Sequence, residues 1–142
     1  MAYRPTSCFI PYRRDTGGNY FVFLQKRSKD AVRLPDFFGF FGGGIEEGET
    51  PLQALMREVY EELAYRTENV RYIGTYRENS LHAYSHAAPD DFEDQITVQE
   101  GEYGKWFTKE QYLTEEKLID LDKIILADIF EILENGTAGE HI

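Results

Sequence analysis

The chain has 142 residues, of which 42% are hydrophobic and 15% aromatic. This is enough for one sizeable core and too little for two ordinary domains, so we expect a single domain over residues 1–142. The 15 lysine and arginine residues face 26 aspartate and glutamate residues, and the formal net charge of −11 makes non-specific attraction to a nucleic-acid polymer or an anionic membrane unfavourable. With one cysteine, Cys8, and no apolar run of signal-peptide or membrane-span length, a cytoplasmic protein is expected.

The first part of the chain predicts a hairpin, a loop and a short strand. Aromatic and branched residues predict strands at 7–12 and 20–25, with turn-forming residues between them. Residues 28–36 are polar and contain a proline, which is typical of a loop. The very apolar residues 37–41 predict a further short strand, after which the three glycines at 42–44 predict an abrupt turn.

From residue 50 the sequence takes on a helical period. Thr50 is expected to cap the helix and Pro51 to occupy its first position, where a missing N–H costs nothing. The helix is expected to run to about Ala64. One of its faces is apolar and consists of Leu52, Leu55, Met56, Val59 and Leu63. A neighbouring face gathers the carboxylates of Glu58, Glu61 and Glu62.

The second half of the chain predicts more strands and a final helix. Branched and aromatic residues predict strands in four segments, 70–77, 81–86, 95–99 and 105–107. A helical region is expected after these strands, strongest over 118–133, and the tail at 136–142 is expected to fray. The order of elements predicts an α/β (α+β) fold with a mixed sheet and helices on its faces.

The glycines at 42–44 are part of a longer pattern that includes the residues after them. Gly43 is followed after five residues by Glu49, and Glu49 after seven by Arg57-Glu58-Val59-Tyr60-Glu61-Glu62. This spacing resembles the signature of the Nudix hydrolase family, G-x5-E-x7-R-E-U-x-E-E-x-G-U, in which U is a bulky aliphatic residue. The resemblance implies a Nudix-type α/β/α sandwich with a mixed sheet, a loop-helix catalytic motif and a C-terminal helix.

Two positions depart from this signature. Ala64 stands where the family has glycine, the residue best able to adopt a left-handed helix end, so we expect the helix to end differently. Tyr65 stands in place of an aliphatic residue, and Phe41 occupies a position where many relatives have proline. None of the three is an expected metal ligand.

The three helical carboxylates have a spacing that suits a metal site. Glu58 and Glu62 lie four residues apart with Glu61 between them, so their side chains converge on one helical face. Such hard oxygen ligands suit Mg²⁺, with Mn²⁺ as an alternative, and a cation relieves the repulsion between like charges. The alternative is a solvated helix face. However, a like-charge pair four residues apart is destabilising, which argues against this alternative.

The resemblance implies roles for the residues around this cluster. The carbonyl of Gly43 is expected to bind the same metal, and Arg57 and Glu49 are expected to orient the catalytic carboxylates. A further metal ligand is expected from the acidic stretch before Trp106, with Glu102 preferred to Glu100. The number of metal ions stays open, and so does the general base among Glu58, Glu61, Glu100 and Glu102.

Basic residues are concentrated in residues 1–33, and the acidic excess lies in the rest of the chain. In a nucleotide hydrolase, basic side chains bind the phosphates that metals do not cover, and aromatic rings stack on a base. Surface charges and core aromatics are the alternative. The candidates for substrate binding are Arg13, Arg14, Lys26, Arg27 and Phe40.

Together these features predict a Mg²⁺-dependent pyrophosphohydrolase acting on a nucleoside diphosphate linked to another moiety. The alternative is a catalytically silent Nudix-like module that binds and senses a nucleotide. The expected partner is a small nucleotide-type substrate, without a nucleic-acid polymer or a membrane, and the protein is expected to be a monomer or a homodimer. Which nucleoside diphosphate derivative is the substrate stays open.

Overall fold

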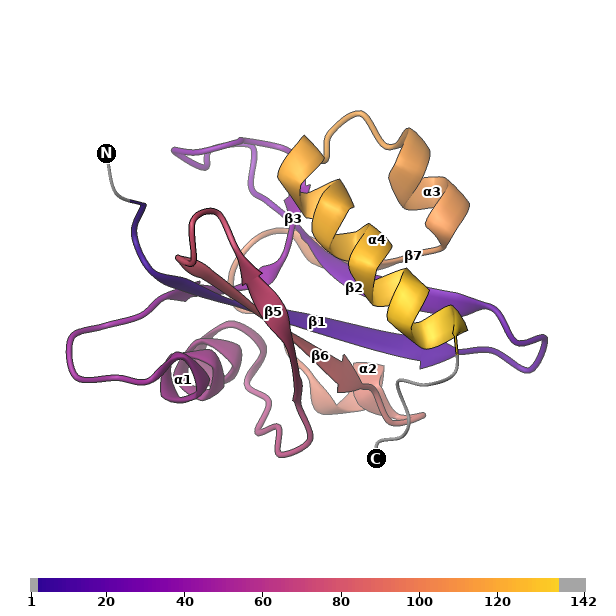
Figure 1. The fold of residues 1–142 in the computed structure, drawn as a ribbon, viewed down its shortest axis with the longest axis horizontal. Coiled ribbons are helices and arrows are strands. Elements are labelled where there is room, and N and C mark those ends of the chain that lie inside the picture. Colours follow the sequence, from indigo (N-terminus) through magenta and orange to yellow (C-terminus); the bar gives the residue numbers. More distant parts are fainter. Residues whose placement is uncertain (1–2, 136–142) are drawn as a thin grey trace.

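The computed structural model describes residues 3–135, so the expected fraying at 136–142 lies outside the described residues. One mixed sheet lies between two helical layers, as Figure 1 shows. The strands are β1 (Thr6–Arg14), β2 (Tyr20–Lys26), β3 (Phe38–Gly39), β4 (Phe41–Gly44), β5 (Arg71–Tyr76), β6 (Leu81–Ala87) and β7 (Tyr103–Phe107). The helices are α1 (Pro51–Leu63), α2 (Phe92–Gln95), α3 (Lys109–Thr114) and α4 (Asp120–Glu134). The expected mixed sheet with helices is confirmed.

The sheet is organised around β1, which has neighbours on both sides. The order along the main path is β3-β2-β1-β6-β5, while β4 pairs with β1 and β7 with β2. The β1–β6 pair is parallel and the other pairs are antiparallel. The first half of β1 therefore contacts β4 and its second half contacts β2, which places β4 at an edge of the sheet.

Each face of the sheet carries its own apolar cluster. One cluster joins alternate residues of β1 and β2 to α3 and α4 through Ile10, Leu24 and Ile129. The other joins the opposite residues to α1 and α2 through Phe9 and Leu55. The period-2 alternation of β1 explains the division, because successive side chains point to opposite faces. No helix among residues 3–135 is both long enough and apolar enough to cross a membrane.

The glycines at 42–44 form a strand, so the expected turn at this position is wrong. Residues 41–44 pair with Thr6–Phe9 of β1, and the expected strand at 37–41 divides into β3 and β4. Gly42 has φ +127°, and a Cβ there would lie 2.1 Å from the carbonyl oxygen of Ser7. Glycine is therefore required at residue 42 because the two backbones approach closely and φ is positive.

The expected strand at 95–99 is also wrong. Gln95 ends α2, and residues 96–99 belong to no strand. Their backbone N–H groups instead reach the end of α1, where Thr97 donates to the carbonyl of Leu63 (2.8 Å) and Gln99 to that of Glu62 (2.7 Å). The last carbonyls of a helix lack partners within it. The segment therefore supplies hydrogen-bond donors to the end of α1 and does not extend the sheet.

Helix α1 begins as its sequence predicts. Thr50 accepts from the backbone N–H of Gln53, whose side chain accepts in turn from the N–H of Thr50, and Pro51 occupies the first turn. Leu55, Val59 and Leu63 of the expected apolar face are buried, with Ala54 beside them. Leu52 is 42% exposed, so its expected place in that face is wrong. The apolar face is thus narrower than predicted.

Candidate active site

Glu58 of α1 lies directly against the glycine strand. A Cβ built on Gly43 would be 2.5 Å from Cδ of Glu58, so a side chain at residue 43 would displace this carboxylate. Gly43 pairs with Ser7 of β1, so both residues face the same side of the sheet. That side faces the start of α1, where the hydroxyl group of Ser7 donates to the carbonyl of Pro51 (2.7 Å). The signature glycine therefore leaves room for the first glutamate of the helix.

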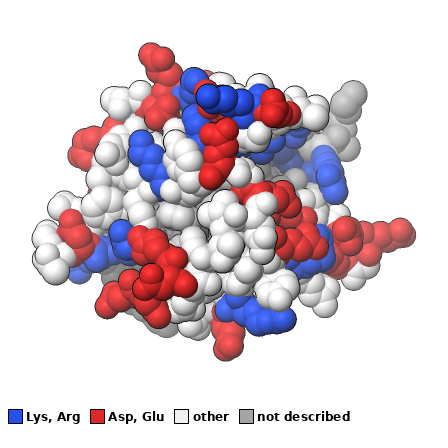
Figure 2. All heavy atoms as spheres, turned by 180° about the vertical axis from the view of Figure 1, so that it is seen from behind, with Lys and Arg blue, Asp and Glu red and all other residues white. Residues whose placement is uncertain are grey.

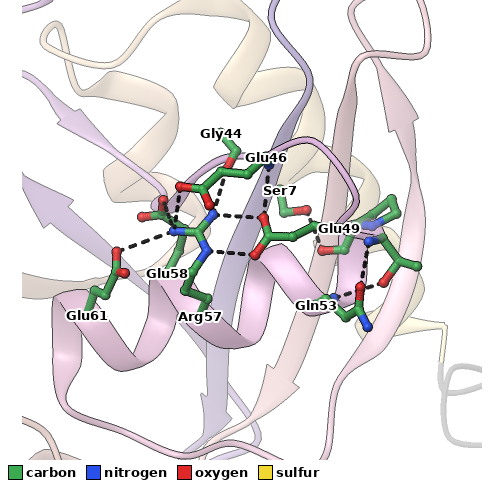
Figure 3. Close-up of polar contacts among 10 residues, drawn as sticks. Ser7, Gly44, Glu46, Glu49, Gln53, Arg57, Glu58 and Glu61 are labelled. Atoms are coloured by element: carbon green, nitrogen blue, oxygen red, sulfur yellow. Dashed lines mark hydrogen bonds and ion pairs between the residues drawn. The ribbon is translucent and has the colours of Figure 1, made fainter.

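Arg57 connects the loop, the helix and the glycine strand (Figure 3). Its guanidinium donates twice to Glu49, at 2.7 and 3.0 Å, and once to the carbonyl of Gly44 at 3.0 Å. It also donates to Glu58 at 3.0 Å and to Glu61 at 3.4 Å. The loop before α1 and the carboxylates on α1 are thus held in one network, the arrangement expected of residues that orient metal ligands.

The ion pairs of Arg57 act unequally on the nearby carboxylates. The guanidinium and the N–H of Glu46 hold the pKa of Glu49 down at about 2. Burial raises the pKa of Glu58 above its usual range, although Arg57 opposes this effect, and the charges of Glu61 and Glu100 add to it. Glu49 is therefore a fixed anion, whereas Glu58 lies where a further cation is favoured.

Glu62 is the buried member of the cluster, with 5% of its surface exposed. Its Oε1 accepts from the backbone N–H of Gly42 at 2.7 Å, and no ion pair joins it to any other described residue. Burial raises its pKa to about 8, with smaller contributions from the charges of Glu58, Glu100 and Glu61. Withdrawal of a carboxylate from water beside other carboxylates destabilises its charged form.

The cluster suits a divalent cation by its chemistry and its charge. The hard carboxylate oxygens of Glu58 and Glu62 border the strand that carries Gly43, and their charged forms gain from any added positive charge. Within residues 3–135 no three acidic, histidine or cysteine side chains are already gathered around one point. Arg57 and the N–H of Gly42 hold two of the carboxylates instead.

The loop between α2 and β7 brings Glu100, rather than Glu102, into electrostatic range of the cluster. The charge of Glu100 acts on the pKa of both Glu58 and Glu62, and Glu102 is not among the main contributors to either. Gln25 donates to the carbonyl of Glu100 at 3.2 Å, which holds this part of the loop against β2. The preference for Glu102 therefore gains no support from the electrostatics of the site.

Three of the basic residues expected to bind substrate interact with partners outside the carboxylate cluster; they are Arg13, Arg14 and Lys26. Arg13 pairs with Glu93 at 2.8 Å and its guanidinium lies 4.1 Å from the ring centre of Trp106. Arg14 lies over the ring of Tyr20 at the far end of the hairpin. Lys26 pairs with Asp36 at 3.0 Å and donates to its carbonyl. Interactions within the protein thus account for these three side chains.

Arg27 and Phe40, the other two candidates, line a cavity of about 550 Å³ beside the glycine strand. Three further arginines line it, Arg4, Arg33 and Arg77, which sequence reasoning missed. The excess of basic residues in residues 1–33 could have pointed to Arg4 and Arg33 as candidates. Arg77 lies in a turn between β5 and β6, where no local sequence pattern marks it.

On the face seen in Figure 2, acidic and basic side chains are interleaved, so the basic residues form no single surface there.

Comparisons with known proteins agree with this geometry. The NUDIX domain family model matches residues 2–128. RNA pyrophosphohydrolase from Francisella tularensis subsp. mediasiatica is 33% identical over 101 residues, which cover 69% of this chain and 57% of that protein. A second RNA pyrophosphohydrolase, from Psychromonas ingrahamii, is 34% identical over 85 residues, or 56% of this chain and 43% of that protein. The matched region thus spans only about half the length of these relatives.

Solved structures share the fold at lower sequence identity. The NUDIX domain of Shewanella oneidensis NrtR, complexed with ADP ribose, superposes with a TM-score of 0.72 at 17% identity, over 94% of this chain and 90% of that chain. A C. elegans Ap4A hydrolase in a binary complex gives a TM-score of 0.69 at 17% identity, over 94% and 99% of the two chains. At these identities the likeness concerns the fold alone.

Proposed function

Since the chain belongs to the NUDIX family, we propose that it is a divalent-metal-dependent pyrophosphohydrolase that cleaves a phosphoanhydride bond in a nucleoside diphosphate linked to another moiety. The observation that carries this proposal is the environment of Glu62. Its carboxylate is nine-tenths buried, faces the charges of Glu58, Glu61 and Glu100, and has no cationic partner among the described residues. Such a cluster is stabilised by a cation from outside the protein.

Mg²⁺, or Mn²⁺ in its place, is the cation whose ligand chemistry fits these residues best. Glu58, Glu61, Glu62 and the carbonyl of Gly43 would hold it. When bound, it supplies neutralisation of phosphoryl charge and activation of the attacking water. Arg57 holds Glu58 and Glu61 through its ion pairs, and Glu49 holds Arg57 through two hydrogen bonds.

A carboxylate of the site would accept the proton released by the attacking water. Glu58, Glu61, Glu100 and Glu102 stay as candidates, and its charge coupling to Glu58 and Glu62 favours Glu100 over Glu102. Replacement of Glu100 and Glu102 by glutamine, one at a time, separates the two: kcat is expected to fall further for Glu100→Gln than for Glu102→Gln.

The proposed activity is tested with a substrate panel, with and without Mg²⁺. The panel contains ADP-ribose, nucleotide sugars, dinucleoside tetraphosphates, nucleoside triphosphates and, because the curated relatives are RNA pyrophosphohydrolases, a 5′-triphosphorylated RNA. We expect metal-dependent release of phosphate, pyrophosphate or a nucleoside monophosphate from at least one of them. Glu58→Gln should abolish that release, and Arg66→Ala, whose guanidinium packs over Tyr60 at 4.4 Å, should retain it.

The alternative is a silent nucleotide-binding module. Binding of a panel member without turnover in any metal would support the alternative and overturn the proposal. The retained set of Glu58, Glu61 and Glu62 argues against the alternative, because binding alone does not require three carboxylates on one helical face. The cytoplasmic location and the monomeric or dimeric state stay predictions.

A further inference from the structure

Tyr65 stands where the family signature has an aliphatic residue. Its side chain belongs to the apolar cluster that packs against α1, and only 6% of its surface is exposed. The centre of its ring lies 5.1 Å from that of Phe92 and 6.5 Å from that of Phe9. An aliphatic side chain could fill the same apolar space. Packing therefore accounts for the ring of Tyr65, whereas its buried hydroxyl group requires a hydrogen-bond partner.

The hydroxyl group of Tyr65 bonds to a buried histidine of β6. Its oxygen lies 2.8 Å from Nε2 of His86, which is 3% exposed. On the other side of the imidazole, Nδ1 lies 2.6 Å from the carbonyl oxygen of Asn69 and 3.1 Å from Oγ1 of Thr67. One imidazole thus connects three residues of the segment 64–70, which joins α1 to β5.

The partners of His86 determine which ring nitrogen donates and which accepts. A backbone carbonyl only accepts, so Nδ1 carries the proton that is donated to Asn69. Burial lowers the pKa of His86, which favours the neutral ring and leaves Nε2 as an acceptor. Tyr65 therefore donates to Nε2. An aliphatic residue at position 65 would deprive this buried nitrogen of its donor, so the two side chains depend on each other. We call them the Tyr65–His86 pair.

The Tyr65–His86 pair holds the end of α1 that carries Glu62. Tyr65 follows Glu62 by three residues, directly after Ala64 caps the helix. The carboxylate of Glu62 accepts from the N–H of Gly42 at 2.7 Å, so its position depends on how closely the last turn of α1 approaches the glycine strand. Through Tyr65, that turn is attached to β6, which pairs with β1 as the glycine strand does. The pair thus limits the movement of Glu62 relative to the glycine strand.

The Tyr65–His86 pair also contacts the segment that leads to Glu100. This segment begins with α2, whose first residue, Phe92, packs against both rings of the pair, at 5.1 and 6.1 Å between ring centres. Near its other end, a backbone N–H donates to the carbonyl of Glu62 at 2.7 Å. A shift of Tyr65 would therefore displace the buried Glu62 and the segment that carries Glu100 together.

Resting on the proposed function, we propose that Tyr65 and His86 are positioning residues. They hold Glu62 where it binds the divalent cation and Glu100 where it accepts the proton of the attacking water. The pair lies in the apolar cluster and acts through the end of α1, not by contact with the cation or the substrate. Groups that orient metal ligands directly change metal affinity or activity by about 10- to 100-fold. We expect a smaller effect, about 3- to 10-fold, because this pair acts through the backbone of the helix.

The first experiment measures metal binding without substrate. Mn²⁺ is titrated into the full chain, and free Mn²⁺ is measured by electron paramagnetic resonance. Tyr65→Phe removes the hydroxyl group and keeps the buried ring, and we expect the Kd for Mn²⁺ to rise about 3- to 10-fold. The matched control is Tyr84→Phe, at another buried tyrosine of the same cluster, whose hydroxyl group bonds to none of the described residues. An unchanged Kd in Tyr65→Phe, or an equal rise in Tyr84→Phe, would overturn the proposal.

Turnover separates positioning from substrate binding. At saturating Mg²⁺, we expect Tyr65→Phe to lower kcat about 3- to 10-fold and to leave KM within about twofold, because the pair acts on the carboxylates and not on the substrate. His86→Asn keeps an amide donor for Asn69 and loses the acceptor for Tyr65. The double variant should therefore be no worse than His86→Asn alone, since both changes break the same bond. A rise in KM alone, or additive losses in the double variant, would contradict the proposal.

The nitrogens of His86 give a readout that requires neither metal nor substrate. In a long-range ¹H–¹⁵N spectrum of the original chain at neutral pH, we expect a protonated Nδ1 and a bare Nε2. In Tyr65→Phe, the ¹⁵N shift of Nε2 should change because its donor is lost, whereas Tyr84→Phe should leave it in place. A proton on Nε2 in the original chain would overturn the proposed bond from Tyr65.

The two proposals fail in different ways. If the affinity for Mn²⁺ depends on Tyr65 and no substrate of the panel is hydrolysed, the proposed activity fails and the positioning role stands. If a substrate is hydrolysed and Tyr65→Phe changes neither kcat nor the Kd for Mn²⁺, the positioning role fails and the activity stands.

Discussion

Arg57 and Glu49 form an ion pair with two parallel hydrogen bonds, Nε to Oε2 at 2.7 Å and Nη2 to Oε1 at 3.0 Å. The same pair holds the pKa of Glu49 down at about 2 and raises that of Arg57. Because Arg57 also donates to the carbonyl of Gly44, the pair fixes the loop, the helix and the glycine strand relative to one another (Figure 3). It thereby positions the carboxylates that would hold the metal.

The two-point pair predicts that Arg57→Lys is not a conservative change. A lysine ammonium is a point charge and cannot reproduce the guanidinium fork. We expect kcat to fall about 10- to 100-fold and the Mg²⁺ concentration for half-maximal rate to rise, as for other residues that orient metal ligands. Metal titrations of the initial rate measure both effects, with Arg66→Ala as the control. An unchanged metal requirement would show that Arg57 does not position the site.

Glu62→Gln should affect stability and activity in opposite directions. The folded pKa of Glu62 is raised from 4.5 to about 8, so the folded state holds the proton more tightly than the unfolded state. The stability of the metal-free protein should therefore fall between pH 4.5 and pH 8. Glutamine removes this loss and can still accept from Gly42. We expect the free energy of unfolding at pH 8 to rise by about 1–3 kcal/mol.

The same variant should lose function, since the buried carboxylate is a proposed metal ligand. We expect turnover to fall by about two orders of magnitude or more, and the rise in Tm on addition of Mg²⁺ to shrink. Chemical unfolding in EDTA and thermal unfolding with and without Mg²⁺ measure the two effects. A variant that is less stable in EDTA would contradict the assignment of Glu62 as a strained, desolvated carboxylate.

Local spacing predicted the parts of the site that lie on one helix. Thr50 and Pro51 specify the start of α1 through capping, and the helical period alone places Glu58, Glu61 and Glu62 side by side. These features depend on residues within a few positions of one another. A single sequence is therefore sufficient to find them.

The missed features depend on segments far apart in the chain. The glycine strand exists because residues 41–44 pair with residues 6–9, and glycine has no strand propensity of its own to announce this pairing. The segment 95–99 alternates because Ile96 and Val98 pack against the α1 side of the sheet, not because it joins a ladder. Arg4 and Arg77, which are 73 positions apart in the chain, meet only through tertiary structure.

Ala64 offers a test of backbone strain. The expected change in how the helix ends is wrong, since Ala64 adopts the left-handed conformation, with φ 51° and ψ 38°, and its N–H donates to the carbonyl of Tyr60. An alanine there is strained, whereas glycine adopts this conformation freely. Ala64 is exposed, so no packing is lost. We expect Ala64→Gly to stabilise the protein by up to about 1 kcal/mol.

Urea unfolding of Ala64→Gly measures this gain. The matched control is Glu68→Gly, at an exposed residue without a positive φ. It should give no stabilisation, because glycine adds conformational freedom to the unfolded chain and relieves no strain in the folded chain. Equal effects at the two positions would mean that the left-handed conformation at residue 64 carries no measurable strain.

Asp122 predicts a second pH dependence, independent of the carboxylate cluster. It lies in the first turn of α4, is 8% exposed, and acts electrostatically on Cys8 of β1. Burial raises its pKa from 3.8 to about 7, although Arg77 opposes this effect. Because the folded state binds this proton more tightly than the unfolded state, the contribution of Asp122 to stability is greatest below pH 3.8 and is lost as the pH rises to about 7.

Asp122→Asn should remove that loss and raise the free energy of unfolding at pH 8 by about 1–3 kcal/mol. Asp120→Asn, an exposed residue of the same turn, should leave the pH dependence unchanged. Urea unfolding from pH 4 to pH 8 compares the two, and parallel profiles for both variants would show that Asp122 is not a desolvated acid.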